Sequence, residues 1–366
     1  MLRDRSQRLL WLSQEAYIEK IANQYEIDLT GRLPDTPMAE SELLPTAYRS
    51  IRPTRPSPDT DLLVRPISLP REAASTMLYQ RKLGSMLYAA TTTRPDIAFA
   101  VSRLARFNQN PSQEHHRAAD RVIQYLYSTR SRAIYYGGDK EGTNGRGRDK
   151  GIRDKGRDDG RDGRSEAQSF ICASDASFAD NSVDRKSSQG YIMKLFGGPI
   201  AWRANKQDTV TTSSTEAELL ALSQTAKEAI FISRLFKAMT LHLNEPLIIN
   251  CDNTQTLRLI TEDTAKLITK LRHVDIHRHW LRQEYAMRRV RFQWTATKEM
   301  IADGLTKALP KQRFQSFVDM IGMVDIKEQL NEEKQLEDLR ENIKARRKDS
   351  DEIIAYLTHG QTREGG

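Results

Sequence analysis

The order of strand-like and helix-like segments between residues 169 and 320 restricts the fold more than any other feature of the sequence. Alternating apolar residues predict strands at 169–177, 189–196 and 199–203, and Gly197-Gly198 supplies the turn between the last two. A long apolar-periodic helix then runs to about Met239. The segments after it read as strand 247–252, helices 253–260 and 270–287, strand 290–297, and helices 301–309 and 312–320. This order predicts an α/β domain of three layers.

The start of the long helix carries two acids that are not equivalent. One of the hydroxyl residues 213–215 can serve as N-cap, and Ser213 and Glu216 have the spacing of a capping box. At about 100° per residue, Glu218 points along the apolar seam near Leu222, whereas Glu216 points to its outer flank. We expect Glu218 to be buried and Glu216 to stay in solvent. Both acids also complement the helix dipole, so this helix alone does not decide their role.

Three more acids stand at informative places. Asp175 ends the first strand, Asp252 ends the strand after the long helix, and Asp303 lies near the start of a late helix. Acids at the ends of neighbouring strands converge on one edge of a sheet, where Glu218 can join them. Clustered carboxylates stay ionised together only beside cations, and Mg²⁺ or Mn²⁺ suits an all-oxygen site. Two such ions, about 3.5–4 Å apart, can activate a water and stabilise the leaving oxygen of a phosphodiester.

The same segments resemble a known family. The ribonuclease H domain of Ty1/copia-type retrotransposon polyproteins is similar to the stretches "CASDASFAD", "SSTEAELLALS", "NCDNTQTLRLI" and "IADGLTK". The end of the reverse transcriptase region of those polyproteins is similar to "LSQEAYIEKI" and to "LGSMLYAATTTRPDIAFAVSRLARF". Together the resemblance covers most of residues 5–323. It implies a ribonuclease H-like domain with a mixed five-stranded sheet, preceded by a mostly helical C-terminal (thumb/connection) region of reverse transcriptase.

The resemblance also implies an activity. Proteins of this family cut the RNA strand of RNA/DNA hybrids with two Mg²⁺ ions, for which Mn²⁺ is an alternative. Matched motif by motif, the catalytic and metal-binding positions fall on Asp175, Glu218, Asp252 and Asp303. The helical phasing prefers Glu218 over Glu216 independently of the resemblance. An alternative hypothesis is a catalytically inactive relic that binds nucleic acid at most.

Five further residues are candidates for contact with the hybrid: Ser214, Thr215, Asn253, His273 and Lys307. Each also has a plainer interpretation. Asn253 has the position of a cap for the following helix, His273 has a position suited to packing, and Lys307 is equally compatible with a solvated surface.

The composition divides the chain into four parts. Residues 1–137 match the end of reverse transcriptase, without the paired aspartates of the palm, so we expect no polymerase activity. Residues 138–168 consist almost entirely of Gly, Arg, Lys, Asp and other polar residues, which predicts a disordered linker. Residues 169–323 form the predicted ribonuclease H-like domain. Residues 324–366 are highly charged with sparse apolar positions and read as a solvated helix.

Charge and cysteine content bear on location and partners. The formal net charge of +8 is compatible with a polyanion partner. Basic residues along the helical region 73–130, among them Lys82, Arg94 and Arg103, are either a solvated face or a nucleic-acid surface. With two cysteines and no apolar stretch of about 18 residues, we expect an intracellular protein, cytoplasmic or nuclear, that does not bind membranes. The expected partners are an RNA/DNA hybrid and the remaining polyprotein domains, the reverse transcriptase palm and integrase.

Overall fold

A computed structural model describes residues 1–39, 70–137 and 170–336 except 242, 244–245 and 263–270, together with 338 and 343, and it gives no side chains for 70–72. Met1–Val324 form one compact unit and Asp325–Gly366 a second, in which residues 327–336 are helical. The predicted linker 138–168 and most of the proline-rich segment 30–70 lie outside the described residues. No helix within the described ranges is long and apolar enough to cross a membrane.

A mixed five-stranded sheet forms the centre of the larger unit, as predicted. Its strands are β4 (Ile171–Ser177), β5 (Ser188–Leu195), β6 (Gly198–Lys206), β7 (Leu247–Cys251) and β8 (Val290–Trp294), in the order β6-β5-β4-β7-β8. Strand β4 is antiparallel to β5 and parallel to β7, and β7 is parallel to β8. The antiparallel strands β5 and β6 need only the tight turn at Gly197, whereas the parallel pairs need helical crossovers.

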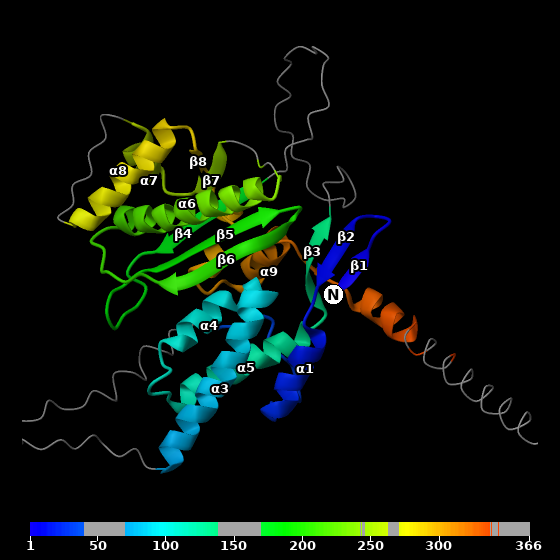
Figure 1. Cartoon of the computed structure of the whole chain (residues 1–366). Coiled ribbons are helices and arrows are strands. Elements are labelled where there is room, and N and C mark those ends of the chain that lie inside the picture. The colour runs from blue at the N-terminus through cyan, green and yellow to red at the C-terminus, as the bar shows by residue number, and fades with distance from the viewer. Residues whose placement is uncertain are drawn as a thin grey trace, which may run out of the picture. The chain divides into compact units, whose positions relative to one another are not determined.

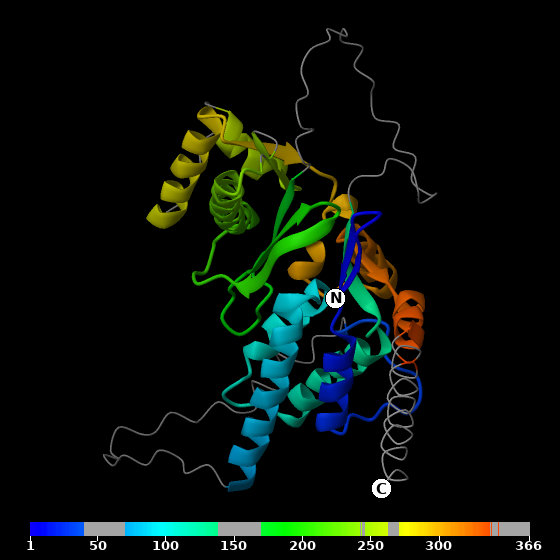
Figure 2. The same cartoon turned by 45° about the vertical axis from the view of Figure 1, so that its right-hand side comes forward.

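The two faces of this sheet belong to two different cores. Side chains alternate along a strand, so Cys172 packs with the core under α6 (Ser214–Ala238), while Ala173 packs with the core that includes the N-terminal helices. Figures 1 and 2 show α6 lying along one face, with α7 (Thr254–Thr261) and α8 (Arg272–Ala286) beside it. The second helical layer is therefore supplied in part by the N-terminal region.

The N-terminal region is mostly helical, as predicted. It contains α1 (Glu15–Gln24), α3 (Pro70–Thr92), the 3₁₀ helix η1 (Pro95–Ile97), α4 (Ala98–Ala105) and α5 (Gln113–Ser128). A small second sheet has the order β1-β2-β3-β9. Its strands are β1 (Leu2–Asp4), β2 (Leu9–Leu12), β3 (Arg132–Gly137) and β9 (Met323–Asp325). Such short strands carry little periodic signal.

Strand β3 joins the N-terminal region to the large sheet. The Gly137 N–H donates to the carbonyl of Phe196 at 3.1 Å, in the turn before β6, and the Tyr135 N–H donates to the carbonyl of Gly322 at 3.3 Å. The Tyr136 hydroxyl donates to the carbonyl of Pro199. One strand of the N-terminal region thus contacts both the β5–β6 hairpin and the chain just before β9.

Two expectations need correction. The helix predicted at 301–309 is only the short 3₁₀ turn η3 (Asp303–Leu305), because Gly304 is a poor helix former and Pro310 stops any continuation into α9 (Lys311–Met320). The basic residues of 73–130 are not simply a solvated face. Arg94 is fully buried and Lys82 nearly so, each beside an aspartate, Asp96 and Asp120 respectively.

Candidate metal centre

Two strands deliver the first two acids to one edge of the large sheet. Asp175 lies in β4 opposite Gly190 of β5, and Asp252 directly follows β7. Since β4 and β7 are parallel and paired from Ile171 with Ile248, their carboxyl ends meet at the same edge. Asp175 is buried and Asp252 is half-buried at the surface.

The first turns of α6 add Glu218. Ser213 is the N-cap, and its hydroxyl accepts from the Glu216 N–H at 3.2 Å. The Glu216 carboxylate accepts from the N–H and the hydroxyl of Thr212, at 2.6 and 2.7 Å. Glu216 therefore has the expected capping role, but the prediction that it stays in solvent is wrong, since only 1% of it is exposed. The loop before the helix covers it, which helical phasing alone does not reveal.

Glu218 points inward, as the phasing predicts. It is 5% exposed, and its Oε1 accepts from the Ala176 N–H at 3.2 Å. Its Oε2 is buried and has no hydrogen-bond partner among the described residues. A buried carboxylate oxygen without a donor is costly, so this atom marks a place suited to a cation.

The four acids converge. One carboxylate oxygen each of Asp175, Asp252 and Asp303 lies within 4.8 Å of the others. A second group, Glu218, Asp252 and the thiol of Cys251, meets the same distance. Asp252 belongs to both groups and is the residue at which they join.

Burial and mutual repulsion disturb the protonation of this cluster. Burial raises the pKa of Asp175 to about 6, with Asp303 and Asp252 adding to the effect and Lys307 and the Thr306 hydroxyl opposing it. Burial, and then the charges of Asp175 and Asp252, raise the pKa of Glu218 well above its ordinary value. A bound cation would offset both the burial and the repulsion between like charges, and it would let these carboxyls ionise.

Two cations and two hydroxyls already contact the cluster. Asp303 forms an ion pair with Lys307 Nζ at 2.7 Å and accepts from Arg313 Nη2 at 2.6 Å, and Asp175 accepts from the Thr306 hydroxyl. The Thr297 hydroxyl donates to Asp252 at 2.9 Å. Four carboxylates against two cations leave a formal excess of two negative charges when all groups are ionised.

The donor set fits a hard divalent cation. All the acids offer oxygen, the ligand atom that Mg²⁺ and Mn²⁺ prefer. Burial, and then the charge of Glu218, raise the pKa of the Cys251 thiol well above its ordinary value, so a thiolate ligand is disfavoured. The unpartnered Glu218 oxygen and the charge excess both agree with a cation at this edge.

The structure places the five predicted substrate contacts around the start of α6 and nearby segments. Ser214 is exposed, and Thr215 accepts through its carbonyl from the Thr256 hydroxyl at 3.4 Å. Asn253 caps α7, accepting from the Thr256 N–H at 3.0 Å. His273 Nε2 lies 3.3 Å from the Thr209 hydroxyl. Lys307, bound to Asp303, is the one of the five that contacts the acids. Contact of these residues with substrate stays a prediction.

Sequence reasoning missed Thr306 and Arg313. Thr306 follows Asp303 by three residues, a spacing that puts both on one side of a helical turn, so the signal was present. Arg313 lies ten residues after Asp303 and reaches it only because α9 folds back, which no local pattern reports.

No protein-family model matches the chain. Among curated proteins, the Retrovirus-related Pol polyprotein from transposon TNT 1-94 of Nicotiana tabacum is 29% identical over 323 residues, which is 88% of this chain and 21% of that protein. The Pol polyprotein from transposon RE1 of Arabidopsis thaliana is 29% identical over 87% of this chain and 18% of its own length. Secreted RxLR effector protein 161 of Plasmopara viticola is 32% identical over 42% of this chain and 91% of that protein.

Solved structures give low overall scores. LC11-RNase H1 in complex with RNA/DNA hybrid aligns with 37% of this chain and 93% of its own, at 13% identity and a TM-score of 0.29. The foamy viral protease-reverse transcriptase aligns with 64% of this chain and 26% of its own, at 15% identity and a TM-score of 0.33. The fold assignment rests on the strand order and register given above.

Strand order and helical layers define a ribonuclease H-like domain. Asp175, Glu218, Asp252 and Asp303, the acids named by the sequence motifs, lie at one edge of its sheet. The chain is similar to retrotransposon Pol polyproteins over most of its length, and it spans about a fifth of the length of the first two relatives named above.

Proposed function

We propose that this chain is an endoribonuclease that hydrolyses the RNA strand of RNA/DNA hybrids with two divalent ions, as part of a retrotransposon Pol polyprotein. The observation that carries the proposal is the convergence of Asp175, Glu218, Asp252 and Asp303 at one sheet edge. Four acids from four separate elements meet there, and one buried Glu218 oxygen has no donor among the described residues. A structural role alone gives no reason to assemble so much negative charge.

Each acid has a distinct part in the proposed site. Asp252, shared by both groups of ligand atoms, would help to hold the ions together with Asp175, Glu218 and Asp303. When bound, the ions supply an activated water and stabilise the leaving oxygen of the phosphodiester. Thr306 orients the Asp175 carboxylate, and Arg313 orients that of Asp303. Mg²⁺ is the expected ion, and Mn²⁺ offers the same oxygen preference.

The substrate follows from the family rather than from the geometry. A hybrid would be held by backbone and 2′-OH contacts rather than by base sequence. Ser214 is exposed and free to face it, and half-exposed Lys307 stands beside the acids, where a phosphate would lie. The reverse transcriptase palm and integrase of the same polyprotein are the proposed partners. A hybrid made during reverse transcription would be met in the cytoplasm or nucleus.

A cleavage assay tests the proposal. The full chain is incubated with a hybrid labelled on its RNA strand, with Mg²⁺ or Mn²⁺, beside single-stranded RNA and a DNA duplex. We expect cuts in the hybrid only, and their loss in Asp252→Asn. Asp28→Asn, which removes an exposed carboxylate of the N-terminal region, should cleave like the unmodified chain. No cleavage of the hybrid with either ion would refute the enzyme and favour an inactive relic.

A further inference from the structure

Helix α9 contacts Asp303 from outside the turn η3, in which Asp303 lies. Arg313 of α9 donates to the Asp303 carboxylate at 2.6 Å. One turn further along, the Phe317 ring lies so close to Gly304 that a Cβ at that position would be 2.6 Å from ring atoms. The place of Asp303 therefore depends on where α9 lies.

Helix α9 also contacts the N-terminal region. The rings of Tyr125 in α5 and Phe314 in α9 pack edge to face, with their centroids 5.6 Å apart. The Phe314 ring in turn lies 6.0 Å from that of Phe317. Arg132 Nη2 donates to Gln315 Oε1 at 3.1 Å. A continuous run of aromatic contacts thus leads from Tyr125 through Phe314 and Phe317 to Gly304, the neighbour of Asp303.

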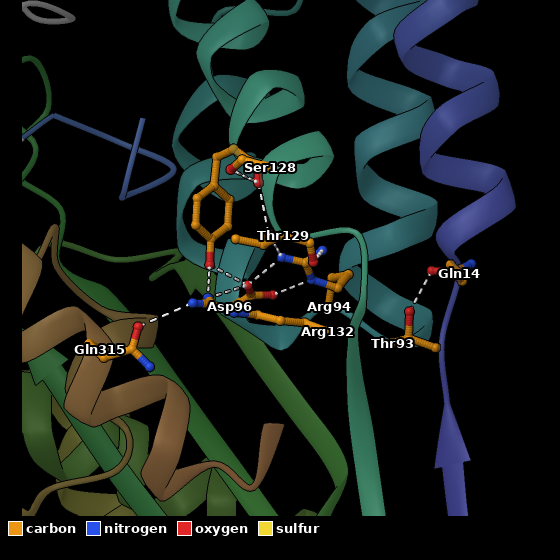
Figure 3. A network of polar contacts seen from close by, with 9 residues as sticks. Gln14, Thr93, Arg94, Asp96, Ser128, Thr129, Arg132 and Gln315 are labelled. Carbon is orange, nitrogen blue, oxygen red and sulfur yellow. Dashed lines mark hydrogen bonds and ion pairs between the residues drawn. The ribbon is translucent and has the colours of Figure 1, made fainter. Parts of the chain in front are cut away.

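Tyr125 is itself fixed by a buried ionic network, drawn in Figure 3. Its hydroxyl donates to Asp96 Oδ2 at 2.6 Å and accepts from Arg132 Nη1 at 2.7 Å. Arg94 binds both oxygens of Asp96, at 2.9 and 2.7 Å, and neither side chain is exposed. Arg94 also donates to the carbonyl and the hydroxyl of Thr129 at the end of α5.

We infer that Tyr125, held by the Arg94–Asp96 pair, is a positioning residue for Asp303 that acts through α9. The inference rests on the proposed function, because it gives Asp303 a role in binding metal. It makes the N-terminal region part of the machinery of the site, although that region contributes none of the four acids.

The network suits this task better than a purely apolar contact would. A buried ion pair returns little net stability, because desolvation offsets the attraction, but it allows only one arrangement of its members. The Tyr125 hydroxyl has one donor partner and one acceptor partner, so the rotation of its ring is fixed. A fixed Tyr125 ring always presents the same edge to Phe314. Because Phe314 packs on Phe317 and Phe317 on Gly304, the orientation of Tyr125 constrains where Gly304 lies.

The test removes only the hydroxyl. Tyr125→Phe keeps the ring and every charge, so it changes position without changing the electrostatics of the acids. In the metal-free protein we expect faster amide hydrogen exchange at residues 302–307. Titration calorimetry should show Mg²⁺ binding weaker by about 10-fold, the lower end for residues that orient metal ligands.

Tyr79→Phe is the matched control. Tyr79 is equally buried, and its hydroxyl donates to the carbonyl of Leu104 at 2.8 Å, within the helical region. It should lower thermal stability in a similar way, with no change in exchange at 302–307 or in Mg²⁺ affinity. Equal effects of the two variants on either readout would overturn the inference.

A double-mutant cycle tests the route. In a chain that carries Phe314→Leu, the additional change Tyr125→Phe should weaken Mg²⁺ binding much less than it does alone, because the contact it acts through is already lost. Additive effects would exclude α9 as the connection. If Tyr125→Phe changes hydrogen exchange at residues 302–307 but the unmodified chain cleaves no hybrid, the positioning role of Tyr125 stands. Only the proposed nuclease activity is then refuted.

Discussion

Replacing Asp175 by Asn should stabilise the metal-free protein at neutral pH while it abolishes metal binding. Asp175 is 2% exposed and stands beside Asp303 and Asp252. Ionisation of its carboxyl in the folded chain is therefore opposed by burial and by like charge. An Asn in its place has the same shape, can still accept from the Thr306 hydroxyl, and offers N–H donors to the neighbouring carboxylates.

The magnitude follows from the pKa. Folding raises the pKa of Asp175 from 3.8 to about 6. The folded chain therefore binds this proton more tightly than the unfolded chain, so the contribution of Asp175 to stability is largest below pH 4 and is lost as the pH rises to 6. Above that window the full cost is about 3 kcal/mol at most. The Asn variant should be more stable than the unmodified chain by up to that amount at pH 7.5, and equal to it near pH 4.

Urea denaturation with EDTA between pH 4 and pH 8 measures this difference. The same denaturation is then repeated with Mg²⁺ in place of EDTA. Mg²⁺ at about 100 times its Kd should stabilise the unmodified chain by about 2.7 kcal/mol and leave the stability of the variant unchanged. A variant less stable than the unmodified chain at pH 7.5, or a difference that does not change with pH, would refute the electrostatic account of the cluster.

Three further substitutions test local features of the fold by urea denaturation. Gly304→Ala should cost about 1–3 kcal/mol, because the new methyl group meets the Phe317 ring, and restored stability in a chain that also carries Phe317→Leu would confirm that contact. Gly84→Ala, at an open position in the interior of α3, should instead stabilise by about 0.5–1 kcal/mol, and a loss there would contradict the open space beside it. Glu216→Ala should cost about 1–3 kcal/mol by leaving the Thr212 N–H unsatisfied. Calorimetry should find its Mg²⁺ affinity unchanged, and a large loss would mean that Glu216 belongs to the metal centre.

The large sheet and its acids were predictable because their signals are local. Asp175 stands near the end of β4 and Asp252 directly after β7, and parallel strands bring such ends together without further information. The choice of Glu218 over Glu216 needed only the helical period. The burial of Glu216 did not follow from that period, because it depends on the loop at Thr212, whose path is set by the chain around it.

The N-terminal contribution to the site was not predictable in this way. Arg94 and Asp96 are two residues apart, but their pairing is significant only because Tyr125 and Arg132 close over them. The contact of Arg313 with Asp303 requires a helix to turn back on its own chain. Contacts of this kind are tertiary, and they leave no periodic trace in the sequence.

Strand β3 has a consequence for how the chain tolerates being cut. Its hydrogen bonds to Phe196 and Gly322 tie the N-terminal region to both the middle and the end of the ribonuclease H-like domain. The covalent connection through residues 138–169 is thus not what holds the two regions together. Tryptic cleavage at the many arginines of that segment should give fragments that migrate as one particle in size-exclusion chromatography and separate only in denaturant. The cut chain would then persist as a non-covalent pair of peptides.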